Sequence, residues 1–215
     1  MYIPDHFRPS ATDVADLLAN LAAADLVSAT AEGLLATMLP LIHEAPGSSA
    51  GAGEHGRLLG HLARNNRQWR TAVIGEAMVI VRGPDAYISP GWYATKGEHG
   101  RVVPTWNYVT AHIHGRLIVH DDPGWVEANV RALTDRHEAT RAEPWAVDDA
   151  PRPYIEGQLR AIVGIEIAIS RIEAKFKLSQ NRSVEDVDGA IAGLEASGAP
   201  DHPVADAMRK VRMRR

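Results

Sequence analysis

Residues 103–120 read VPTWNYVTAHIHGRLIVH and give the clearest structural pattern in the chain. From residue 109 to residue 119, apolar side chains occupy every second position, with Gly115 in the same series. Four of the five intervening positions hold Thr110, His112, His114 and Arg116. A period of two over this length is typical of a half-buried β-strand. The sequence therefore predicts a long strand with one face in a core and the other facing solvent, a ligand or a partner subunit.

Composition places the chain among ordinary globular proteins. It has 215 residues, of which 45% are hydrophobic and 23% charged, and a net charge of −4. This charge gives no reason to expect nucleic acid as a partner, because nucleic-acid-binding domains are usually basic. The chain has no cysteine, which excludes disulfides, thiolate metal sites and a cysteine nucleophile. We see no secretory leader and no apolar run of membrane-spanning length, so we expect a cytoplasmic protein.

Other strands are expected on both sides of this stretch. Residues 25–30 and 33–42 look like two strands of a hairpin, and residues 56–62 like a third strand. Two short strands, 77–81 and 87–89, are expected around a turn at Gly83-Pro84-Asp85. A final strand is expected where apolar residues alternate from 163 to 169.

Helices are marked by capping patterns. Ser10 with Asp13, Asp122 followed by Pro123, and Ser183 with Asp186 each predict a helix start. Strands in hairpin order with helices at the start, middle and end do not fit a doubly wound sheet. We therefore expect a mainly β protein, an antiparallel barrel with peripheral helices, as one domain over residues 1–196 with a helical, basic tail over 197–215.

Three features invite a functional interpretation, and each has a structural alternative. The junction from His61 to Asn66 leads from a strand into a short helix, where Arg64 could bind an anion or could be a solvated surface cation. Tryptophans near turns could stack on a planar ligand or could close a core. The arginine-rich C-terminal tail could contact phosphates, lipid or an acidic partner, but terminal charge runs are usually just solvated.

Several other site classes have no support in the sequence. The ten histidines include no HExxH pattern, so we expect no metal site. Neither a G-x-S-x-G, a G-x-G-x-x-G nor a P-loop is present. A DNA-reading motif is likewise not visible, and no catalytic acid or base can be named.

Five motifs together resemble the PaiB-like family of FMN-binding negative transcriptional regulators. They are MYIPDHF (1–7), GHLARNNRQW (60–69), GPDAYISPGWY (83–93), VPTWNYVTAHIHGRL (103–117) and IEAKFKLSQNR (172–182). The resemblance implies an FMN-binding split β-barrel of the antiparallel type. It also implies a homodimer with the flavin in a groove at the subunit interface, and DNA as a possible partner.

The resemblance also suggests which residues hold the cofactor FMN. His61, Arg64 and Asn65 are candidates for the phosphate and ribityl chain, because FMN needs cations and N–H donors there. Candidates for the ring and for closing the pocket, from the same or the other subunit, are Trp92, Tyr93, Thr105, Trp106, Asn107, Lys177, Ser179, Gln180 and Asn181.

Two alternatives to a regulator remain open at the level of sequence. One is an FMN-dependent oxidoreductase, a flavin reductase or an enzyme like pyridoxamine-phosphate oxidase, by analogy of fold. The other is a haem-binding protein, suggested by His61, His112 and His114.

Overall fold

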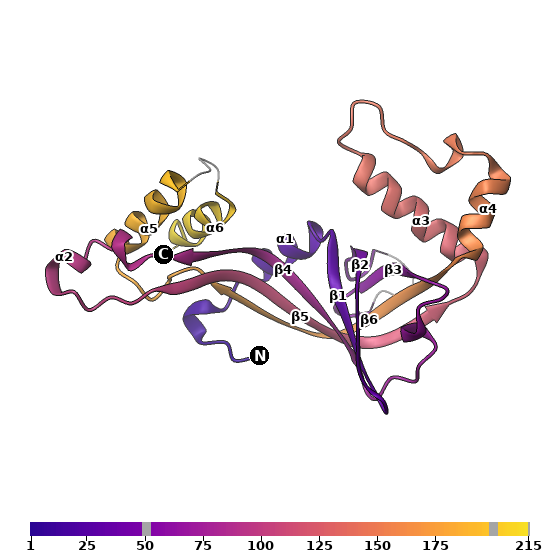
Figure 1. The fold of residues 1–215 in the computed structure, drawn as a ribbon, viewed down its shortest axis with the longest axis horizontal. Coiled ribbons are helices and arrows are strands. Elements are labelled where there is room, and N and C mark those ends of the chain that lie inside the picture. The colour runs from indigo at the N-terminus through magenta and orange to yellow at the C-terminus, as the bar shows by residue number, and fades with distance from the viewer. Residues whose placement is uncertain (49–52, 198–201, 215) are drawn as a thin grey trace. The chain divides into compact units, whose positions relative to one another are not determined.

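The fold of the chain is a closed six-stranded barrel, seen here in a computed structural model that describes residues 1–48, 53–197 and 202–214 (Figure 1). The strand order around the barrel is β1-β2-β3-β6-β5-β4. β1 pairs antiparallel with β2 and with β4, and β3 pairs antiparallel with β2 and with β6. The predicted mainly β, antiparallel barrel with peripheral helices is confirmed. The strands are β1 Ala23–Thr30, β2 Gly33–Glu44, β3 Arg57–Ala63, β4 Ala77–Ile88, β5 Thr105–His120 and β6 Ile162–Lys177.

The helices begin where the capping patterns predict. Asp122 accepts from the backbone N–H of Trp125 at 2.8 Å, and Ser183 caps the next long helix through Asp186 at 3.3 Å. The α-helices are α1 Ala11–Ala19, α2 Lys96–His99, α3 Pro123–Glu138, α4 Arg152–Arg160, α5 Val184–Ala196 and α6 Pro203–Arg212. Short 3₁₀ turns cover Asp5–Phe7, Arg67–Trp69, Pro90–Trp92 and Val147–Asp149.

The described residues form two compact units. Unit 1 comprises residues 1–14, 82–111 and 173–215, and unit 2 comprises residues 15–81 and 112–172. Unit 2 holds β1, β2, β3, α3 and α4, while unit 1 holds α2, α5 and α6. The three long strands, β4, β5 and β6, each contribute residues to both units. The division of the sequence at residues 196 and 197 stays a prediction, and residues 198–201 and 215 of that tail, like residues 49–52, lie outside the described residues.

In the first part of β5, buried side chains alternate with less buried ones, as the sequence predicts. Val109, Ala111 and Ile113 are buried, and the polar residues between them are only partly buried. Beyond Gly115 the alternation of buried and exposed side chains weakens. Val119 continues the apolar series but is 37% exposed. The backbone remains a strand throughout, so the period of two predicted the element correctly and its burial only in part.

The prediction of a turn at residues 83–85 between two short strands is wrong. β4 runs without interruption from Ala77 to Ile88 and includes Gly83-Pro84-Asp85. A Cβ on Gly83 would lie 2.8 Å from Cβ of Val109, so glycine is needed here for close packing against β5. A Gly-Pro-Asp run has the composition of a turn, and only the neighbouring strand makes it part of a ladder.

Among the described residues, no helix is long and apolar enough to cross a lipid bilayer.

Candidate functional site

The twelve predicted site residues fall in both units. His61, Arg64 and Asn65 belong to unit 2, and the other nine belong to unit 1. Each group is described within its own unit. The structure separates residues whose side chains are committed to packing from residues that remain accessible to a ligand.

Arg64 follows β3 and is largely engaged within the chain. Its Nε donates to the carbonyl of Arg160 at 2.8 Å, and its Nη2 donates to Asp121 at 2.6 Å and to the carbonyl of Ile162 at 3.0 Å. The hydrogen bond from Arg64 holds the pKa of the Asp121 carboxyl below its usual value. A third of the Arg64 side chain is exposed, so an anion could still approach it, but would meet Asp121 there.

The pocket beside Arg64 has mixed charge. It has a volume of about 250 Å³, and the residues that line it are Arg64, Asp121, Pro123, Val126, Glu127, Arg152, Glu156, Leu159 and Arg160. Glu127 accepts from Arg152 at 2.7 Å and from Arg131 at 2.8 Å, which lowers its pKa to about 2. Arginines and carboxylates therefore largely neutralise one another at this place.

The asparagines after Arg64 have different roles. Asn66, not Asn65, caps the turn at Arg67–Trp69, because its Oδ1 accepts from the N–H of Gln68 at 2.8 Å. Asn65 is exposed, and its side chain is accessible to a ligand.

Gln68 is a structural residue that the sequence did not single out. It is 2% exposed, and its Nε2 donates to the carbonyl of Leu26 and to Oγ of Ser28, both at 3.0 Å. Its Oε1 accepts from Thr37 at 2.6 Å. Much of the GHLARNNRQW motif therefore ties the end of β3 to β1 and β2, and no sequence periodicity marks a glutamine whose partners lie some 30 to 40 residues away.

His61 lies on β3 in an apolar surrounding. It lines a pocket of about 230 Å³ with Val130, Trp145, Val147, Ile155, Gln158, Leu159 and Ile162. Its Nδ1 is buried and has no hydrogen-bond partner among the described residues. Burial lowers the pKa of the imidazole, so the ring is neutral near neutral pH.

In unit 1, Trp92 and Tyr93 are packing residues. A Cβ on Gly193 would lie 2.2 Å from the Trp92 ring, and one on Gly189 would lie 2.1 Å from the Trp92 carbonyl oxygen. α5 therefore approaches Trp92 closely only because it carries glycine at these positions. Tyr93 is 3% exposed, and the guanidinium carbon of Arg182 lies 4.7 Å from the centre of its ring.

Asn107, Ser179 and Gln180 also serve the internal structure. Asn107 is fully buried and donates to Oγ of Ser179 at 3.0 Å, and Ser179 adopts a left-handed backbone conformation with φ of 67°. Gln180 accepts from the N–H of Leu178 at 2.7 Å and donates to the carbonyl of Phe176 at 2.5 Å. These contacts fix the turn that follows β6.

Thr105, Trp106 and Lys177, with Asp85 and Tyr87, form an accessible group that we call the Lys177 cluster. Lys177 Nζ donates to Oγ1 of Thr105 and, at 2.8 Å, to the carbonyl of Trp106. Trp106 is 52% exposed, and its Nε1 donates to Asp85 at 2.7 Å. The ring of Tyr87 meets the indole edge-on, with ring centres 6.3 Å apart.

The charge of Lys177 is not neutralised by a carboxylate among the residues that the structure describes. Burial, and then the charge of Lys175, lowers the pKa of the Lys177 ammonium. Lys175 itself lies 5.6 Å from the ring centres of Tyr2 and Tyr108. The exposed Trp106 side chain, with the Lys177 ammonium on the carbonyl of the same residue, fits a planar, anionic ligand, because the ring can stack and the cation can bind its charge.

Three arginines of the C-terminal tail, two in α6 and one after it, pair with acidic residues. Arg212 pairs with Asp188 at 2.7 Å, Arg209 contacts Glu195 and Arg214 contacts Asp13.

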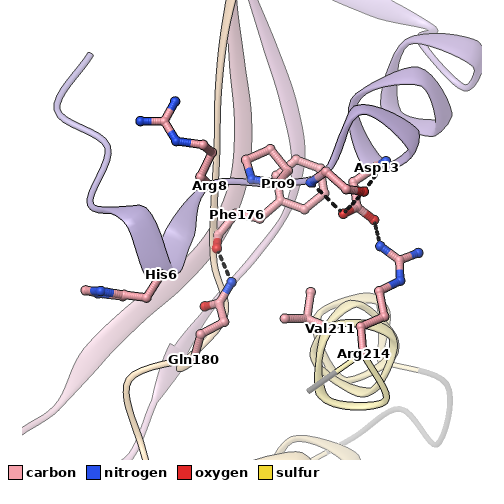
Figure 2. Close-up of a pocket in the computed structure, with 9 residues that line it drawn as sticks. His6, Arg8, Pro9, Asp13, Phe176, Gln180, Val211 and Arg214 are labelled. Atoms are coloured by element: carbon pink, nitrogen blue, oxygen red, sulfur yellow. Dashed lines mark hydrogen bonds and ion pairs between the residues drawn. The ribbon is translucent and has the colours of Figure 1, made fainter.

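Figure 2 shows the Asp13–Arg214 contact at a pocket between the first residues of the chain and α6. The pocket has a volume of about 410 Å³. These arginines of the tail are therefore paired with carboxylates within unit 1, and are not simply solvated as the sequence suggested.

Metal binding finds no site in the described part of the chain. Across residues 1–48, 53–197 and 202–214, no three His, Asp or Glu side chains gather as a metal ion would require.

Comparison with known proteins gives a family and a fold. A family model described as "Putative FMN-binding domain" matches residues 1–171. The protease synthase and sporulation protein PAI 2 of Bacillus subtilis is 30% identical over 203 residues, which cover 94% of this chain and 92% of that protein. An uncharacterised protein of Emericella nidulans, AN0679, is 33% identical over 187 residues and 74% of each chain.

Two solved structures share the fold. An FAD and haem binding protein from Mycobacterium smegmatis matches with a TM-score of 0.56 at 18% identity, over 88% of this chain and 80% of its own. The flavocytochrome Anf3 from Azotobacter vinelandii matches with a TM-score of 0.53 at 14% identity, over 79% of this chain and 68% of its own.

Proposed function

The chain belongs to the family of FMN-binding domains, with FMN as its cofactor, and we propose that it is a regulatory homodimer holding the flavin in a groove at the subunit interface. The Lys177 cluster is the observation that carries the proposal. When bound, FMN supplies a redox-active ring and an anionic phosphate. Trp106 provides an exposed ring face, and Lys177 provides a cation with no carboxylate partner among the described residues.

The proposed phosphate side includes Arg64 and Asn65 of unit 2. Arg64 keeps a third of its side chain accessible, and Asn65 is exposed. In the proposed dimer both subunits contribute residues to the flavin groove. We assign no flavin contact to Trp92, Tyr93, Asn107, Ser179 or Gln180, whose side chains are committed to packing, and none to Asn181.

The proposed dimer is supported by an apolar outer face of the sheet in unit 2. Leu34 and Met38 of β2 are 76% and 72% exposed. By register, Met38 lies opposite Asp25, which also pairs with Ile80 of β4, so one row of side chains crosses three strands. The apolar residues of this face are Ala23, Val27, Ala29, Leu34, Ala36, Met38, Pro40, Met78 and Ile80. An exposed apolar surface that extends over three strands is typical of a protein interface.

The regulatory role rests on the resemblance to the PaiB-like regulators and on the similarity to PAI 2 of Bacillus subtilis. Whether regulation involves DNA directly can be tested by gel shift at physiological salt. The flavin-loaded protein and its own promoter region would be compared with random DNA. Direct repression predicts tighter binding to the promoter, and equal binding to both would leave only an indirect regulatory role.

The flavin site is tested with Trp106→Ala. We expect the affinity for FMN, measured by quenching of flavin fluorescence, to fall about tenfold, because aromatic stacking contributes roughly 0.5–1.5 kcal/mol beyond buried area. Trp145→Ala is the matched control, because Trp145 is also about half exposed but belongs to unit 2 and is not part of the Lys177 cluster. Equal FMN affinity in wild type and Trp106→Ala would remove Trp106 from the site.

A further inference from the structure

The Nζ atom of Lys177 lies among neutral acceptors and near another cation. It donates to Oγ1 of Thr105 and, at 2.8 Å, to the carbonyl of Trp106, and neither acceptor carries a charge. Lys175, two residues earlier on β6, repels it, and the two ammonium groups lie 5.6 and 5.9 Å from the centre of the Tyr108 ring. Repulsion between like charges and loss of hydration both favour the neutral amine over the ammonium.

The carboxylates closest in the sheet to Lys177 are engaged elsewhere. Asp85 of β4 accepts from Nε1 of Trp106 at 2.7 Å, and Glu173 of β6 pairs with the N-terminal ammonium. Burial, followed by the charge of Lys175, lowers the pKa of the Lys177 ammonium. At a given pH, a larger fraction of Lys177 than of an ordinary lysine is therefore neutral.

The hydrogen bonds of Nζ also suit the neutral form. A neutral amine has two N–H groups and one lone pair, whereas an ammonium has three N–H groups. Because Thr105 and Trp106 accept two hydrogens, the neutral amine keeps both bonds and its lone pair points away from both acceptors. The side chain of Lys177 is only partly buried, so an electrophile can reach this lone pair.

We propose that Lys177 is a reactive amine that condenses with an aromatic aldehyde. The lone pair of Nζ attacks the carbonyl carbon, a C=N bond replaces the C=O bond, and the carbonyl oxygen leaves as water with the two amine hydrogens. The exposed indole of Trp106 in the same cluster offers a ring on which the aryl group can stack.

Flavin regulates this reaction, and this part of the inference rests on the proposed function. FMN bound at the Lys177 cluster covers Nζ, and its negative charge keeps the amine protonated. Bound FMN therefore blocks the condensation, and the flavin-free protein is the reactive form.

The chain contains its own reference sites for a test. Its four lysines are at positions 96, 175, 177 and 210. Lys96 and Lys210 are exposed, whereas Lys177 is partly buried. If exposure alone determined reactivity, the two exposed lysines would react before Lys177. If the surroundings of the amine determine it, Lys177 reacts first.

The test labels flavin-free protein briefly with 4-formylbenzoate and sodium cyanoborohydride, which reduces the imine to a stable amine. Peptide mass spectrometry then measures the label at each lysine. At a pH below these pKa values, we expect Lys177 to be labelled at least about threefold faster than Lys96 and Lys210, because the rate follows the neutral fraction. Equal or slower labelling of Lys177 overturns the proposal, and this comparison needs no variant.

Two further comparisons test the cause and the class of aldehyde. Lys175→Gln removes the neighbouring charge, so it should slow the labelling of Lys177 towards the rate of Lys96. With propanal, which has no ring, the preference for Lys177 should be smaller than with 4-formylbenzoate. An unchanged rate in Lys175→Gln would contradict the charge argument, and an equal preference for both aldehydes would overturn the aromatic class.

Saturating FMN separates this proposal from the proposed flavin site. FMN should protect Lys177 and leave the labelling of Lys96 and Lys210 unchanged. If Lys177 reacts fastest but FMN does not protect it, the flavin site is wrong and the reactive lysine stands. If Lys177 does not react fastest, the reactive lysine is wrong whatever FMN does.

Discussion

At the scale of residues, the environment of each cation decides what it can bind. Arg64 and Arg214 are candidate phosphate ligands in the sequence, and each is paired with an aspartate in the fold, although a third of the Arg64 side chain stays accessible. Lys177, also a candidate in the sequence, has no carboxylate partner among the described residues, and its ammonium donates to the carbonyl of Trp106, whose side chain is exposed. Charge count alone therefore cannot identify an anion site, because the partner of each cation determines whether its charge is available.

The lowered pKa of Lys177 leads to a prediction about pH. As pH rises through this pKa, the ammonium loses its proton and the affinity for FMN should fall. This fall should occur at a lower pH than the one at which an ordinary lysine titrates. Lys177→Arg stays charged and should show a flat profile over the same range, measured by fluorescence titration between neutral and alkaline pH. An equal fall in both proteins would show that another group is responsible.

A loss of protein stability at high pH would be another possible cause of a fall in FMN affinity, but the titration of Lys177 does not produce one. Between the lowered pKa of Lys177 and its ordinary value, the unfolded chain binds more protons than the folded chain. The contribution of Lys177 to stability therefore rises with pH across this window. Thermal unfolding at each pH provides the check.

At the scale of elements, glycines determine how closely two segments pack. Gly193 of α5 faces the Trp92 ring, whereas Gly157 of α4 has only a guanidinium nitrogen of Arg160 nearby, 3.9 Å from an added Cβ. Both glycines lie within helices, where alanine is normally favoured. The same substitution should therefore have opposite effects in the two helices.

We expect Gly157→Ala to raise the free energy of unfolding by about 0.5–1 kcal/mol, because it reduces the entropy of the unfolded chain. Gly193→Ala should lower the free energy of unfolding by about 1–3 kcal/mol, because its Cβ would overlap Trp92. Urea unfolding of both variants measures the difference. A stabilised Gly193→Ala protein would mean that α5 can move away from Trp92 at little cost.

At the scale of the whole molecule, the apolar outer face of β1, β2 and β4 is the feature that a single chain does not explain. Its side chains lie on the opposite side of the strands from the buried residues Leu26, Leu39 and Val79, so they cannot contribute to the barrel core. A second copy of the chain would bury this surface.

Met38→Lys should disrupt the proposed dimer, because it places a charge in the middle of this face. Sedimentation velocity should show a shift from dimer to monomer at micromolar concentration. Met213→Lys is the matched control, because Met213 is 78% exposed in unit 1, outside this face. If wild type is a monomer, or if Met38→Lys remains a dimer, the interface proposed here is wrong.

Local patterns in the sequence were enough to predict most of the elements and the family. Alternation predicted β5, capping residues predicted the starts of α1, α3 and α5, and five motifs indicated an FMN-binding split barrel. These features depend on residues close together in the chain, or on motifs long enough to be specific.

Which candidate residues remain accessible to a ligand could be seen in the tertiary structure and not in the sequence. It showed that Asn107 and Ser179 bind each other, that Gln68 joins three segments of the chain, and that the indole of Trp106 stays exposed. It also made residues 83–85 part of a strand, because glycine allows β4 to approach Val109. The physical reason is that burial and hydrogen bonding depend on neighbours distant in sequence, which no local pattern contains.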